Sequence, residues 1–248
     1  MEIAPRVDFL GLTFDVSVMI GTVVTSILVL LLTILATRNV QMRPGGLQNL
    51  VEMILDFVRG ILNISFDQKT AEKYLGFTLT LFLFIFIANQ LGVMLMVTTE
   101  VHHPIPGLGV TAEALKDSHG IAWLKSPTAD LNVTVVMAVG IALFAHFMGI
   151  RKNAKGYISH YFQPFAPMAL IHIIDEIAKP TTHAMRLWAN IFAGEVLITI
   201  MLTYGGPLMT GAPLVVWLGY SLFVGTIQAY VFTVLASVYI AQKTVQDH

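Results

Sequence analysis

The residues with the clearest chemical potential lie in one apolar segment in the last third of the sequence. They are His172, Asp175, Glu176, Lys179, His183, Arg186, Asn190 and Glu195. In a membrane-spanning helix, a charge near the bilayer centre costs about 2.5–3.5 kcal/mol on insertion scales. Such side chains face a water-filled cavity, a partner or one another, so this segment indicates a pathway for ions.

Helical projection divides these residues between two faces. At about 100° per residue, Asp175 and Lys179 fall within about 20° of Arg186. Glu195 falls about 180° away from Arg186 and about 13.5 Å further along the helix axis. The spacing suggests two aqueous pathways that do not line up, with Arg186 between them.

Arg186 has chemistry that suits this place. An arginine stays protonated at any working pH, so it cannot relay protons, but it blocks a proton wire electrostatically and attracts a carboxylate. For Asp175 and Glu176 the alternative interpretation is that they solvate a helix end. For Lys179 the alternatives are snorkelling to the interface and pairing with either acid.

The composition excludes a soluble globular protein. Of 248 residues, 56% are hydrophobic and 12% are charged, against about 25% charged in an average soluble domain. A net charge of −1 with 14 Lys and Arg argues against a nucleic-acid partner. The chain has no cysteine, which excludes disulfides and thiolate chemistry.

Motifs for catalysis or cofactor binding are missing from the sequence. It has no phosphate-binding loop, no metalloprotease or nucleophile-elbow motif, and no metal-ligand spacing among its eight histidines. We therefore expect no metal, no cofactor, no direct ATP binding and no catalysis by the chain alone.

The elements that must position these residues are membrane helices. We expect an all-α polytopic membrane protein with about five embedded helices and one amphipathic interfacial helix, because a span needs about 20 apolar residues. The alternative interpretation of the amphipathic segment is a soluble helix that connects two spans. We expect one membrane domain over 1–248, divided into a first span (1–38), the amphipathic helix (46–65), two spans (74–98 and 130–151) and a tilted hairpin (165–204 and 212–242).

The last two apolar stretches are too long for an upright helix. Pro167–Tyr204 would extend about 57 Å as a helix, whereas the hydrocarbon layer is about 30 Å thick. We therefore predict either a break, with Pro180 as a kink site, or strong tilt. The segments Tyr204–Pro207 and Gly211–Pro213 are predicted to bound the connection between the two helices, and Thr98–Asp130 is predicted to be a polar loop.

The distribution of basic residues predicts the orientation. With the N-terminus outside, only Arg6, Lys116 and Lys125 lie outside. The inside then holds Arg38, Arg43, Arg59, Lys69, Lys73, Arg151, Lys152, Lys155 and Lys243. The mixed charge at the N-terminus does not resemble a transit peptide, so we expect a bacterial plasma membrane protein with its C-terminus in the cytoplasm. An organelle-encoded membrane protein is the alternative.

Three motifs carry a family resemblance. The run Lys179–Glu195, with Arg186-Leu187-Trp188-Ala189-Asn190 followed by Ala193-Gly194-Glu195, resembles the signature of the a subunit of F-type ATP synthases. The run Gln228–Phe232 resembles a second signature of that family, a glutamine followed by aromatic residues. The run Pro127–Thr134 resembles the family's entry to its fourth helix.

The resemblance implies a membrane stator that faces a rotating ring of c subunits and assembles with the b-subunit peripheral stalk and other subunits. It implies that Arg186 meets the ring carboxylate, that Glu195 and Gln228 lie on the proton path, and that Asn190 lies one turn after the arginine. Ion flow through two half-channels would then be coupled to ATP synthesis or hydrolysis.

The chain departs from the family pattern on the inner side. Family members often carry other residues where this chain has His172, Asp175 and Glu176, and some carry a histidine near Ser221. These four residues and His183 are therefore candidates for the proton path because of their side-chain chemistry, and not because of the family resemblance.

Two alternatives come from other classes. A self-contained secondary ion transporter usually needs inverted repeats, and we see no repeat. An intramembrane hydrolase needs a nucleophile–base pair or a metal motif. Protons are the expected coupling ion, and sodium is the alternative.

Overall fold

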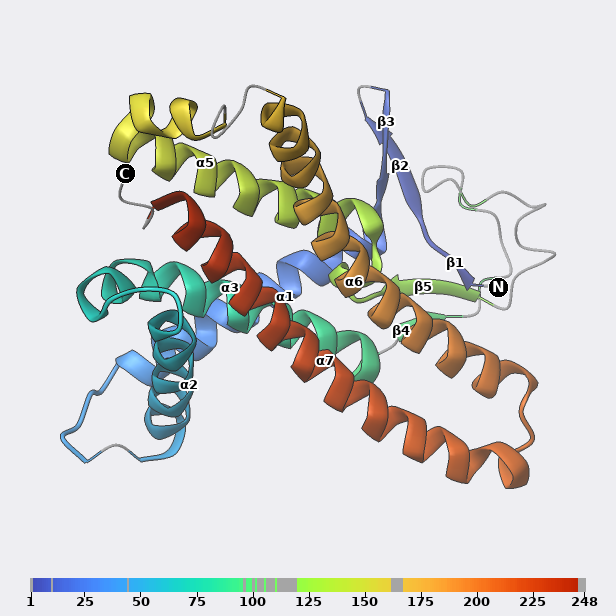
Figure 1. Cartoon of the computed structure of the whole chain (residues 1–248). Coiled ribbons are helices and arrows are strands. Elements are labelled where there is room, and N and C mark those ends of the chain that lie inside the picture. The colour runs from blue at the N-terminus through green and yellow to red at the C-terminus, as the bar shows by residue number, and fades with distance from the viewer. Residues whose placement is uncertain are drawn as a thin grey trace. The chain divides into compact units, whose positions relative to one another are not determined.

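The computed structural model describes residues 2–9, 11–43, 45–95, 97–99, 101, 105, 110, 120–161 and 167–244 (Figure 1). Most of these residues lie in helices: α1 (Val16–Thr37), α2 (Gly46–Asn63), α3 (Gln68–Met94), α5 (Leu131–Tyr161), α6 (Met168–Tyr204) and α7 (Pro207–Thr244). Within the described residues, five helices are long and apolar enough to cross a membrane. The prediction of an all-α polytopic membrane protein is confirmed.

The spanning helices follow the apolar runs, with differences at their ends. Helix α1 lies within the predicted first span (1–38) but begins only at Val16, and α3 begins at Gln68, a few residues before the predicted span at 74–98. In α5 the backbone turns at Asn153, with φ −156° and ψ 86°, so two helices meet there. The apolar span of α5 is Leu131–Ala154.

Helices α6 and α7 are longer than a single upright crossing requires. They contain 37 and 38 residues and continue through Pro180 and Pro213. The prediction of a connection at Gly211–Pro213 is wrong, because α7 already begins at Pro207. A proline removes one backbone hydrogen bond, and a long membrane helix tolerates that loss. The described connection is Gly205-Gly206.

Short strands accompany the helices, and the sequence patterns did not indicate them. Strand β2 (Arg6–Phe9) pairs antiparallel with β3 (Leu12–Asp15) across a turn in which Gly11 has φ +79°. A second sheet has the order β1 (Glu2–Ile3), β5 (Gly120–Leu124), β4 (Val97–Thr99). The prediction of a polar loop over Thr98–Asp130 is wrong for β5, and much of that segment lies outside the described residues.

The chain divides into two compact units. The first unit contains Met1–Leu31, Phe84–Asp130 and Asn190–Thr226. The second unit contains Leu32–Leu83, Leu131–Ala189 and Ile227–His248. The division crosses α6 after Ala189 and α7 after Thr226, so each long helix contributes to both units.

Each unit has its own packing. In the second unit, α2 buries Val58, Ile61 and Leu62, and Phe57 lies 5.6 Å from Phe82 and 5.7 Å from Tyr230 between ring centroids. The amphipathic helix is therefore docked on its own unit through one apolar face. In the first unit, hydrogen bonds from Asn89 and from a short 3-10 turn, Pro127–Ala129, join segments distant in sequence.

Candidate functional site

A buried carboxylate opens onto a cavity in the first unit. The Glu195 residue is 7% exposed. The cavity has a volume of about 140 Å³. It is lined by Val93, Asn190, Ile191, Ala193, Gly194, Glu195, Trp217, Tyr220, Ser221 and Val224. Among these lining residues, none carries a positive charge.

Close contact between α6 and α7 positions this carboxylate. The indole nitrogen of Trp217 donates a hydrogen bond to the carbonyl oxygen of Gly194 at 3.3 Å. A Cβ added at Gly194 would lie 3.5 Å from Oγ of Ser221, an ordinary contact distance, so α7 packs close to α6 at this point. The sequence predictions Asn190, Glu195 and Ser221 therefore meet at one cavity.

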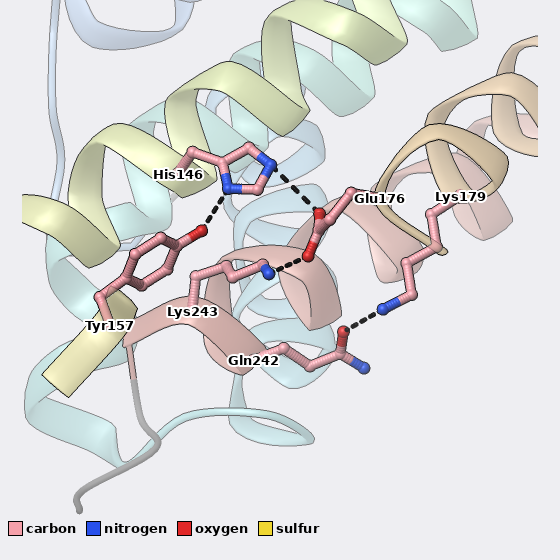
Figure 2. Close-up of polar contacts among 6 residues, drawn as sticks. All are labelled: His146, Tyr157, Glu176, Lys179, Gln242 and Lys243. Atoms are coloured by element: carbon pink, nitrogen blue, oxygen red, sulfur yellow. Dashed lines mark hydrogen bonds and ion pairs between the residues drawn. The ribbon is translucent and has the colours of Figure 1, made fainter. Parts of the chain in front are cut away.

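A second carboxylate, that of Glu176, lies between the side chains of Lys243 and His146 in the second unit (Figure 2). The Glu176 carboxylate accepts a hydrogen bond from the ammonium of Lys243 and lies 3.1 Å from Nε2 of His146. The other ring nitrogen of His146 is hydrogen-bonded to the hydroxyl of Tyr157. Glu176 thus joins α6 to both α5 and α7. The cavity beside its carboxylate has a volume of only about 10 Å³.

The remaining polar residues of α6 differ in burial. The ammonium of Lys179 donates a hydrogen bond to Oε1 of Gln242 on α7 at 3.5 Å. His183 is buried against Phe232, with ring centroids 3.8 Å apart, and 5.7 Å from the ring of Tyr239. His172 is half-buried and Asp175 is exposed.

Arg186 is exposed on α6. It shares this exposure with large apolar residues of the same helix, including Ile177, Met185 and Phe192. Helical projection places these three apolar side chains about 100–180° away from Arg186. The exposed residues on the same face as the guanidinium include the polar Asp175 and Thr182.

The structure also shows what sequence reasoning missed. Gln228, which the sequence did predict, is half-buried on α7 in the second unit. Trp217, Tyr157 and Lys243 were not among the candidates for the site. Their types are common at helix ends and in apolar helices, so only the packing register of the helices identifies them. Among the described residues, no three His, Asp or Glu side chains cluster as metal ligands would.

Comparison with known proteins identifies the family. Residues 18–241 match the protein family described as ATP synthase A chain. The chain belongs to this family. It is 36% identical over 251 residues to ATP synthase subunit a of Priestia megaterium (strain ATCC 12872 / QMB1551), covering 99% of this chain and 98% of that protein. It is 39% identical over 244 residues to ATP synthase subunit a of Staphylococcus aureus (strain JH9), covering 96% and 93%.

Family membership confirms the resemblance carried by the three sequence motifs. All three, Lys179–Glu195, Gln228–Phe232 and Pro127–Thr134, lie inside the matched region. The match also covers the five long apolar helices almost completely.

Proposed function

We propose that this chain is the membrane stator subunit of a rotary ATP synthase. It faces the ring of c subunits, is held by the b-subunit peripheral stalk, and provides two offset half-channels for protons. Proton flow through them turns the ring and is coupled to ATP synthesis or hydrolysis elsewhere in the complex. The chain itself neither binds nor hydrolyses ATP.

The observation that carries this proposal is the contrast between two residues of one continuous helix. On α6, Arg186 is exposed, whereas Glu195 is buried beside a cavity. Helical periodicity turns the two side chains to opposite sides, about 13.5 Å apart along the axis. A continuous helix with this pattern supplies an exposed fixed charge and, beyond it, an enclosed proton-exchanging group.

The outer half-channel in this proposal leads to Glu195, with Asn190, Ser221 and Gln228 as further polar groups. A ring carboxylate takes a proton from this path, turns with the ring, and releases the proton to the inner half-channel. His172, Asp175, Glu176 and His183 belong to the inner path. The exposed Asp175 gives access to water, and the contacts of Glu176 hold the helices at its mouth in place.

Arg186 separates the two paths. Its guanidinium stays charged, so it repels a proton that would pass directly between them. It also attracts each ring carboxylate as that carboxylate passes in its unprotonated form. Within the membrane this attraction is stronger than in water, because charges interact more strongly where water is excluded.

The orientation follows the basic residues, with the N-terminus outside and the C-terminus in the cytoplasm of a bacterium. Protons are the proposed coupling ion. Transport by reconstituted complexes in the presence and absence of sodium decides between the two ions, because a sodium-coupled complex needs sodium for ATP-driven transport.

The variant Arg186→Ala tests the proposal. We expect the complex to assemble and ATP-driven acidification of inverted membrane vesicles to be abolished. Arg151→Ala is the matched control, because Arg151 is also exposed and lies at the end of the apolar span of α5; this variant should pump normally. Coupled pumping by assembled Arg186→Ala complexes would rule out the proposed role.

A further inference from the structure

A glycine of α3 lies directly against the carboxylate of Glu195. Gly92 is buried, and a Cβ atom built on it would lie 2.5 Å from Oε1 of Glu195. The same atom would lie 2.5 Å from Cβ of Ser126. Non-bonded carbon and oxygen atoms do not approach this closely, since attractive contacts lie at about 3.5–4.0 Å. The space above Gly92 is therefore already filled by the carboxylate.

The wall on the Ser126 side is held by hydrogen bonds. Oγ of Ser126 donates to the carbonyl oxygen of Ala88 at 2.9 Å and lies 2.8 Å from Oγ1 of Thr128. Thr128 in turn donates to Oδ1 of Asn89 at 2.6 Å. Ser126, Thr128 and Asn89 are each fully buried, so water cannot replace a hydrogen bond that is broken among them. This wall therefore resists displacement.

The same network fixes α3 against α7. Nδ2 of Asn89 donates to the carbonyl oxygen of Gly225 at 2.8 Å. A Cβ added at Gly225 would lie 3.2 Å from Cβ of Asn89, so the two helices are in close contact at this point. Gly92 follows Asn89 by about one helical turn. Its distance from α7 and from the Glu195 carboxylate is therefore set by this contact.

We infer that Gly92 and Ser126 are positioning residues for the Glu195 carboxylate, and that the missing side chain at Gly92 sets how deeply this carboxylate reaches between the helices. This inference rests on the proposed role of Glu195 in the outer half-channel. Proton transfer needs donor and acceptor within hydrogen-bond distance. A displacement of about 1 Å can cost about 100-fold in rate, so the space at Gly92 controls proton loading.

A simpler role for Gly92 would be close packing of α3 against Ser126, with no effect specific to the carboxylate. The two roles differ in their dependence on the length of the side chain at Glu195. Replacing glutamate by aspartate removes one methylene group and withdraws the carboxylate from α3. It relieves a collision with a methyl group at Gly92, but it leaves a collision with Ser126 unchanged.

A double-mutant cycle tests the inference in inverted vesicles that contain the assembled complex. Gly92→Ala should lower ATP-driven proton pumping about tenfold, by displacing the carboxylate. Glu195→Asp should also lower pumping on its own, because the carboxylate then falls short. The combination should pump faster than Gly92→Ala alone. Gly76→Ala is the matched control on the same helix, where a Cβ meets nothing within 4 Å, and it should pump normally.

The result that overturns the inference is a double variant whose loss is the product of the two single losses. If Gly92→Ala does not assemble, the cycle is repeated in a Ser126→Gly background, which removes the collision with Cβ of Ser126. Recovery of pumping by Glu195→Asp in that background supports the inference, and no recovery overturns it. The proposed function fails separately, if Glu195→Gln pumps at the unaltered rate.

Discussion

The two units of this protein place the same residue type of the same helix in different surroundings. In the first unit, Glu195 borders a cavity of about 140 Å³ whose described lining carries no positive charge. In the second unit, Glu176 contacts Lys243 and His146 beside a space of about 10 Å³. A cavity needs a volume of about 10–15 Å³ to hold one water molecule. The first site therefore has room for several waters and the second for at most one.

The difference shows that neighbours decide what a carboxylate in a membrane helix does. Glu176 joins three helices, since Lys243 belongs to α7 and His146 to α5. Its contacts hold helix ends together. Glu195 has glycines around it, at positions 92 and 194, and hydroxyl and amide groups on the cavity wall. Its surroundings provide space and access, which proton exchange requires.

We expect the largest effect on stability from replacing Glu176, in the second unit. Glu176→Ala leaves the ammonium of Lys243 without its carboxylate partner, and the Lys243 side chain is only 16% exposed. Removing one partner of such a pair costs about 3 kcal/mol. We expect a lower thermal dissociation temperature of the assembled complex. Asp175→Ala is the matched control, since Asp175 is exposed; an equal shift in both variants would contradict the anchoring role of Glu176.

A smaller loss is expected in the hydrogen-bond network of the first unit. Asn89→Ala removes the two buried hydrogen bonds to Gly225 and Thr128, at a cost of about 2 kcal/mol. Thermal unfolding of the chain in detergent measures it. Gln90→Ala, which removes bonds from a half-buried side chain, should cost less. If Gln90→Ala costs as much, burial of the network is not what stabilises this unit.

The smallest effect is expected at an exposed carboxylate just before α3. The backbone N–H of Thr70 is 3.4 Å from Oδ2 of Asp67, and hydrogen bonding with Thr70 lowers the pKa of Asp67 from its usual 3.8. A lowered pKa contributes stability above the unfolded value, and that stability is lost as the pH falls through the lowered pKa. Asp67→Asn should therefore lower the melting temperature slightly at neutral pH and not at all in strong acid. A difference that grows on acidification would contradict this assignment.

Much of the fold could be predicted from the sequence because membrane helices have a simple requirement. A run of about 20 apolar residues has few alternatives, so a membrane span was predicted where α1 lies, within 1–38. The short strands β4 and β5 have too few residues to show a period. The start of α7 was missed because Gly211, Ala212 and Pro213 are typical of a turn in water, whereas a membrane helix tolerates proline.

The candidate residues of α6 were predictable because charge is scarce in this sequence. Arg186 and Glu195 stand out in an apolar segment, and helical periodicity assigns them to opposite faces. The partners of these residues could not be predicted. Lys243 reaches Glu176, and Gly92 reaches Glu195, only through the register in which one helix packs on another. A glycine in particular contributes by lacking a side chain, which no residue pattern reveals.

The most direct test of this account is the rate of ATP-driven proton pumping by Glu195→Gln in inverted vesicles, normalised to the amount of assembled complex. Glutamine keeps the size of the side chain but cannot exchange a proton, so we expect pumping to fall about 100-fold with normal assembly. Glu176→Gln, measured in parallel, should affect the stability of the complex more than Glu195→Gln does. An unchanged pumping rate in assembled Glu195→Gln complexes would contradict the account.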